Sequence, residues 1–159
     1  MFTVNYEFYS ETYGGTAVDE TAWPRYQMRA SVMLDRLTYG HIKEENEVYG
    51  QYICGTFVEF TEEELNYLSF AFCSLIDADK MLNDCRDQAL AGSSSDGNVK
   101  SRTSGGESIS YEIRRTAYDD ALSDEGAKIK LMKEAVFNVC DPFLFRYNPF
   151  YAGLESRWE

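Results

Sequence analysis

The sequence predicts a mainly α-helical protein: a small bundle of three to four helices with one β-hairpin and extended terminal segments. Two observations lead to this fold class. Apolar residues recur three or four positions apart over three segments, and a glycine-containing turn separates two short segments of alternating polarity. The length of 159 residues suits one domain, and 44% apolar with 26% charged residues is typical of a globular chain.

We expect three parts along the chain: an N-terminal arm over 1–20, a helical domain over 21–142, and an aromatic C-terminal tail over 143–159. The arm is rich in aromatic residues and is interrupted by Gly14-Gly15. This pattern favours an extended or irregular strand over a helix in the first fifteen residues.

The first helix is predicted over 22–39. Thr21 is a candidate N-cap, and Pro24 lies in the first turn, where proline is tolerated. Gly40 follows the last periodic residue, in the position that favours a left-handed C-terminal cap.

The next segment, 41–60, is rich in β-forming residues and glycines, so the sequence leaves a short hairpin and an ordered loop as alternatives. A long helix is predicted over 62–90. Thr61 and Glu64 form a capping box at its start. Asp79 lies within its apolar stripe, which indicates a buried or interfacial partner for an arginine.

A Gly/Ser-rich stretch over 92–98 predicts a flexible loop. The hairpin follows, with strands over 99–103 and 107–112. A further helix is expected to begin near a Ser123 cap and to end at Asp141-Pro142.

The charge balance excludes one class of function. The chain has 15 basic and 27 acidic residues, for a net charge of −12. A general nucleic-acid binder needs clustered Lys and Arg to neutralise phosphates, so the acidity argues against that role. No apolar run reaches the length of a membrane span, and the first residues lack a basic signal-peptide head. We therefore expect a soluble protein made inside the cell, without membrane contact.

The residues offer little catalytic chemistry, so we predict no enzyme activity, no metal and no cofactor. His41 is the single histidine, which leaves no multi-histidine metal site. The four cysteines lack metal-binding spacing and are expected to be free thiols. The remaining aspartates of the long helix lie off its apolar stripe and are interpreted as a solvated face; they are Asp77, Asp84 and Asp87.

The last 19 residues hold six aromatic side chains, which cannot stay solvated without cost. Two alternatives remain open. Either this tail folds back on its own core, or it anchors in another protein, since aromatic residues dominate protein interfaces.

Four short patterns occur in one order along residues 20–147. They are Ala30-x-x-x-Leu34-Asp35-x-Leu37-Thr38-x-Gly40, Val99-Lys100-Ser101, Gly106-x-Ser108-x-Ser110-Tyr111 and Leu144-Phe145-Arg146. This order resembles the head–tail connector (adaptor) proteins of tailed bacteriophages, which form a ring below the portal.

The resemblance implies a non-enzymatic virion protein at the head–tail junction, made in the host cytoplasm. Its implied partners are the portal protein, neighbouring copies in a twelve-fold ring, and a downstream tail or stopper protein. DNA would pass through the lumen without specific binding. The expected portal-docking residues are Phe143, Phe145, Arg146, Tyr147, Phe150, Tyr151 and Trp158. The expected subunit or tail-side contacts are Val99, Lys100, Arg102, Ile109 and Tyr111.

A second function class stays open. An acidic regulatory or inhibitor protein, such as a DNA mimic that binds a basic host protein, would have the same charge. Oligomer mass separates the two classes, because a DNA mimic is expected to be a small monomer or dimer.

Overall fold

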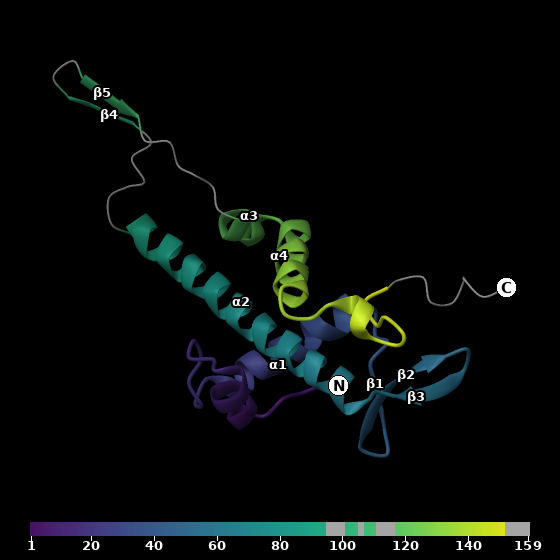
Figure 1. Ribbon diagram of the computed structural model, residues 1–159. Coiled ribbons are helices and arrows are strands. Elements are labelled where there is room, and N and C mark those ends of the chain that lie inside the picture. Colours follow the sequence, from purple (N-terminus) through teal and green to yellow (C-terminus); the bar gives the residue numbers. More distant parts are fainter. Residues whose placement is uncertain (95–100, 105–106, 111–116, 152–159) are drawn as a thin grey trace. The chain divides into compact units, whose positions relative to one another are not determined.

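The computed structural model describes residues 1–94, 101–104, 107–110 and 117–151, and the predicted mainly α fold with a small sheet is confirmed (Figure 1). The helices are η1 Phe8–Tyr13, α1 Trp23–Leu37, α2 Glu62–Ser94, α3 Ala117–Ser123, α4 Glu125–Phe137 and η2 Pro142–Leu144. The strands are β1 Lys43–Glu45, β2 Val48–Ile53, β3 Thr56–Glu59, β4 Ser101–Ser104 and β5 Glu107–Ser110. The chain forms two compact units, one of Met1–Lys80 with Met132–Glu159 and one of Met81–Leu131.

The N-terminal arm contains a helix, so the expectation of an extended or irregular strand is wrong over Phe8–Tyr13. The helix η1, a π-helix, begins where the Asn5 side chain accepts a hydrogen bond from the backbone N–H three residues later, at 2.8 Å. It ends at Gly14, whose φ is +76°. Tyr9, on this helix, is fully buried. Burial of an aromatic side chain and a local cap outweigh the intrinsic preference of the segment.

The interpretation of Asp77 as part of a solvated face is also wrong, because Asp77 accepts hydrogen bonds from the arm. Tyr9 donates a hydrogen bond to one carboxylate oxygen of Asp77 at 2.6 Å, and Tyr13 donates to the other at 3.0 Å. The backbone N–H of Ala17 donates to the Tyr9 hydroxyl at 3.1 Å. A Cβ at Gly15 would lie 2.2 Å from the Tyr9 ring, so the close packing of the arm requires glycine there.

The helix α1 is confirmed, with a different cap from the one expected. The side chain of Asp19 accepts hydrogen bonds from the Ala22 N–H at 2.8 Å and from the Thr21 hydroxyl at 2.6 Å, so the acceptor at this end is Asp19. At the other end, Gly40 has a φ of +69° and donates its N–H to the Asp35 carbonyl at 2.8 Å. The left-handed cap is therefore confirmed.

Segment 41–60 forms a three-stranded antiparallel sheet in the order β1-β2-β3, which settles the open choice in favour of a hairpin with an added strand. Cys54 and Gly55, with φ of +50° and +78°, connect β2 to β3 in a two-residue turn of the kind that tight hairpins prefer.

The helix α2 has the predicted capping box and continues to Ser94, past the expected end at residue 90. The Glu64 N–H donates to the Thr61 hydroxyl at 3.2 Å, and the Thr61 N–H donates to the Glu64 carboxylate at 2.8 Å. The predicted arginine partner of Asp79 is Arg29, at 2.7 Å. One side of α2 supplies the centre of the core, with Leu68, Ala71, Phe72, Leu75 and Ile76 all buried.

The predicted second hairpin is confirmed in its strands, since β4 and β5 pair antiparallel with Arg102 opposite Ile109. The expected flexible loop over 92–98 overlaps the end of α2, and its residues 95–98 lie outside the described residues, as do 99–100 and 111–112 of the expected hairpin.

The last long helix, α4, differs from the prediction at both ends. Its N-terminal acceptor is Asp124, which takes hydrogen bonds from the N–H groups of Gly126 and Ala127, whereas the Ser123 hydroxyl bonds back to a carbonyl of α3. The helix ends at Phe137, before Asp141-Pro142. Asp141 instead caps the short helix η2, accepting from the Phe143 N–H at 2.9 Å.

Candidate docking surface of the C-terminal segment

The described part of the aromatic tail, residues 141–151, is called here the C-terminal segment. It has an inner and an outer set of side chains. Phe145 and Phe150 are buried, whereas Phe143 is 90% exposed and Tyr151 is 47% exposed. Leu144 and Tyr147 are also exposed.

The inner set fixes the segment to its own chain by aromatic contacts. The Phe145 ring packs edge-on against Phe60 and Tyr67 with centroid distances of 6.2 Å each. Phe150 meets Phe145 at 6.1 Å and Phe137 at 5.6 Å. Edge-to-face contacts at these distances are favourable beyond the burial of area alone.

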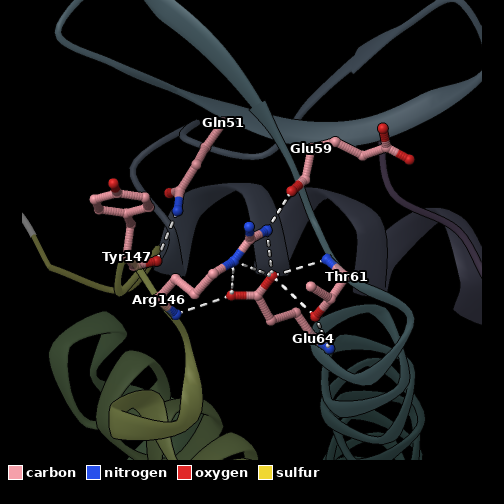
Figure 2. A network of polar contacts seen from close by, with 6 residues as sticks. All are labelled: Gln51, Glu59, Thr61, Glu64, Arg146 and Tyr147. Atoms are coloured by element: carbon pink, nitrogen blue, oxygen red, sulfur yellow. Dashed lines mark hydrogen bonds and ion pairs between the residues drawn. The ribbon is translucent and has the colours of Figure 1, made fainter.

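An ion pair between the half-exposed Arg146 and the buried Glu64 holds the same segment at the start of α2 (Figure 2). The Arg146 guanidinium lies 3.0 Å from a Glu64 carboxylate oxygen, and the Arg146 backbone N–H donates to the other oxygen at 2.8 Å. The guanidinium also donates to the Glu59 carbonyl. The Glu64 side chain is only 5% exposed, so this carboxylate acts both as the cap of α2 and as the anchor of the C-terminal segment.

Electrostatics at Glu64 favour the charged form. Burial alone would raise the pKa of this carboxyl, but hydrogen bonds from the Arg146 side chain, the Thr61 N–H and the Arg146 N–H outweigh it and lower the pKa to about 2. The pKa of Arg146 is raised by its hydrogen bonds to Glu64. The pair is therefore ionised throughout the neutral range.

Two further side chains bind backbone carbonyls of the segment. Gln51, buried on β2, donates its amide to the Tyr147 carbonyl at 2.7 Å. His41 Nδ1 lies 3.1 Å from the Pro149 carbonyl. With Glu64, these contacts fix three positions of a segment that has little regular secondary structure.

The outer set forms the candidate docking surface, which we name the C-terminal patch. It consists of Phe143, Leu144, Tyr147 and Tyr151. Exposed large apolar residues held on a fixed backbone are typical of protein-binding sites, because little conformational entropy is lost when a partner covers them. Exposed apolar and aromatic side chains on an anchored backbone are suited to non-covalent docking.

The structure separates the residues expected to dock. Phe143, Tyr147 and Tyr151 lie in the exposed set. Phe145 and Phe150 pack within their own unit, and Arg146 pairs with Glu64, as the alternative of a tail folded on its own core predicts. We therefore remove these three from the proposed docking set. Trp158 lies outside the described residues.

Of the expected subunit or tail-side contacts, Arg102 and Ile109 are opposite each other in the β4–β5 register. Val99, Lys100 and Tyr111 lie outside the described residues.

The contacts that anchor the C-terminal segment were not predicted from the sequence. The capping-box pattern indicates Glu64 as a cap, but its second partner is 82 residues away. Gln51 and His41 carry no pattern that would reveal contacts with carbonyls 96 and 108 residues away.

Within the described residues, no group of three or more His, Cys, Asp or Glu side chains could hold a metal ion. Burial raises the pKa of the Cys73 and Cys140 thiols to about 12, with smaller contributions from Asp77 and Asp141 respectively. These two thiols are protonated at neutral pH and are poor nucleophiles. In the same part of the chain, none of the helices combines the length and apolarity that a membrane crossing requires.

No family model, curated protein or solved structure matches the sequence.

Proposed function

We propose that this protein is a non-enzymatic structural protein of the head–tail connector kind. In this proposal twelve copies form a ring between the portal and the tail of a tailed phage, at the head–tail junction of the virion. The ring gives DNA a transit channel and presents docking surfaces to the portal and to a downstream tail or stopper protein.

The observation that carries the proposal is the C-terminal patch. The Phe143 side chain is 90% exposed two residues before Phe145, which is buried in the protein's own core. A segment anchored through Glu64, Gln51 and His41 holds its outer side chains in place before any partner arrives. Pre-organised aromatic anchors of this kind contribute strongly to binding at protein interfaces.

The charge of the chain supports the same proposal. A channel through which DNA moves must not hold phosphates, and a chain with a net charge of −12 repels them. The acidic regulator remains the alternative, and it predicts binding to a basic protein in place of a portal ring.

The test measures binding to portal rings from the phage or prophage that encodes this chain. Purified protein is mixed with these rings, and native mass spectrometry counts the copies bound. We expect twelve copies on one face, and at least a tenfold loss of affinity for Tyr151→Ser or Tyr147→Ser. Tyr52→Ser is the matched control, because Tyr52 is an exposed tyrosine on β2 outside the C-terminal patch.

Absence of portal binding by the folded wild-type protein would reject the connector role. Equal losses for Tyr151→Ser and Tyr52→Ser would reject the patch as its docking surface.

A further inference from the structure

The outer side of α1 carries a second surface that the proposed function does not use. Arg25, Met28, Val32 and Asp35 follow one another at intervals of three, four and three residues, and all four are exposed. This spacing places them in one line along the helix. Met28 is 63% exposed and Val32 is 52% exposed.

The opposite side of α1 already fulfils the packing role of the helix. Trp23, Tyr26, Ala30, Leu34 and Leu37 are buried against the core of their unit. An amphipathic helix therefore does not need Met28 and Val32, the two large apolar side chains on the outward line, to pack against its own core. Such residues indicate a contact with another molecule when a second observation identifies the partner.

The second observation is the symmetry of the line. Met28 and Val32 lie two residues before and after Ala30, and Arg25 and Asp35 lie five residues before and after it. In an antiparallel pair of identical helices that touch through their outer faces at the level of residue 30, midway between these positions along the axis, Met28 of one copy is opposite Val32 of the other. Arg25 of each copy is then opposite Asp35 of the other copy, so this charge pair forms twice. The line is therefore self-complementary. Apolar side chains face apolar side chains, and each charge faces the opposite charge.

We propose that the outer face of α1 binds a second copy of this chain, antiparallel, with its twofold axis between Met28 and Val32. Within one copy Arg25 and Asp35 are about 15 Å apart along the helix axis, which is too far for them to pair. A parallel arrangement would oppose Arg25 to Arg25. The antiparallel arrangement gives each of these charges a partner of opposite sign in the other copy.

An isologous contact closes at two copies and cannot by itself propagate into a ring. The α1 pairing is therefore a property of the free chain and does not depend on the proposed connector role. Because a single helix pair buries less than a standard interface, we expect the dimer to dissociate in roughly the 10 µM to 1 mM range.

The experiment is sedimentation velocity of the full chain over this concentration range. We expect a concentration-dependent monomer–dimer equilibrium, which Met28→Glu weakens at least tenfold. Met81→Glu is the matched control, since Met81 is also an exposed methionine on a helix, at 54%, and lies outside α1. It should leave the equilibrium unchanged.

Charge reversal tests the antiparallel register. Arg25→Asp and Asp35→Arg each create two like-charge contacts, so each should weaken the dimer several-fold. The double variant R25D/D35R restores opposite charges and should recover wild-type association to within about threefold, and high salt should reduce all these differences.

The inference is overturned by a chain that stays monomeric up to about 1 mM, by an assembly that Met28→Glu does not weaken, or by a double variant no better than the single ones. Portal binding is measured separately through Tyr151→Ser, so failure of the dimer and failure of the connector role are distinct results.

Discussion

The N-terminal arm and the C-terminal segment are attached to the same helix, α2, through a carboxylate, but by different chemistry. Asp77 accepts two neutral tyrosine hydroxyls from the arm. Glu64 accepts a charged guanidinium and a backbone N–H from the C-terminal segment. The arm buries Tyr9 completely, whereas the C-terminal segment buries only its inner side chains.

This difference predicts opposite responses to pH at the two ends. Burial and the hydrogen bond to Asp77 raise the pKa of Tyr9 above its ordinary value of 10.0, and burial with the Asp77 charge does the same for Tyr13. The arm contact therefore loses its stabilising effect in alkali. Since the pKa of Glu64 is lowered, the C-terminal contact loses its effect in acid.

Truncation after Pro142 should give the largest effect. It removes two buried phenylalanines and the partner of the buried Glu64 carboxylate, so we expect a loss of roughly 5 kcal/mol or more in the free energy of unfolding. Truncation after Tyr151 keeps every contact described above and is the matched control. Urea titration followed by circular dichroism measures both, and a stable chain ending at Pro142 would contradict the packing of the inner set.

Glu64→Gln should come next, with a loss of about 2–3 kcal/mol, because Arg146 loses its charged partner while remaining half exposed. The matched control is Glu63→Gln in the same turn of α2, where the carboxylate is exposed and accepts from the Tyr67 hydroxyl. We expect the control to change the free energy of unfolding by less than about 0.5 kcal/mol. Similar losses of stability for both variants would show that the ion pair with Arg146 contributes no more than an exposed carboxylate does.

The loss of stability in acid should come from the same carboxyl group, that of Glu64. The stabilisation from Glu64 is complete above its ordinary pKa of 4.5 and is lost as the pH falls through about 2. We expect on the order of 2 kcal/mol to disappear over this window in the wild type, after allowing for the half-exposed partner. Glu64→Gln should flatten this acid limb; an unchanged limb would place the titrating group elsewhere.

Tyr9→Phe should have a smaller effect, about 1–2 kcal/mol, because it removes one hydrogen bond to a charged acceptor and keeps the ring. Its effect should be the same at pH 6 and pH 8, since the tyrosine is neutral at both. A loss that grows as the pH falls from 8 to 6 would contradict the division of pH sensitivity between the two ends.

The sequence predicted features whose signals lie within a few residues of one another. The capping box at Thr61, the left-handed Gly40 and the Arg29 partner implied by Asp79 in an apolar stripe are all found. The sequence did not predict the features that depend on contacts between residues far apart in the chain. The arm contains a helix because Tyr9 is buried and bonded to Asp77, which lies 68 residues away.

The candidate site shows the same limit. The aromatic content of the tail predicts that it must be covered, but not which side chains turn inward. That division follows from Glu64, Gln51 and His41, which bind three positions of the backbone and so orient Phe145 and Phe143 differently.

The most direct test of this account compares Phe143→Ser with Phe145→Ser, two identical substitutions two residues apart. Thermal unfolding and affinity for portal rings are measured for both. We predict that Phe143→Ser keeps the wild-type melting temperature and loses at least tenfold in affinity, whereas Phe145→Ser unfolds about 3–5 kcal/mol more easily. A Phe143→Ser protein that binds portal rings as tightly as the wild type would contradict the claim that the outer set is the docking surface.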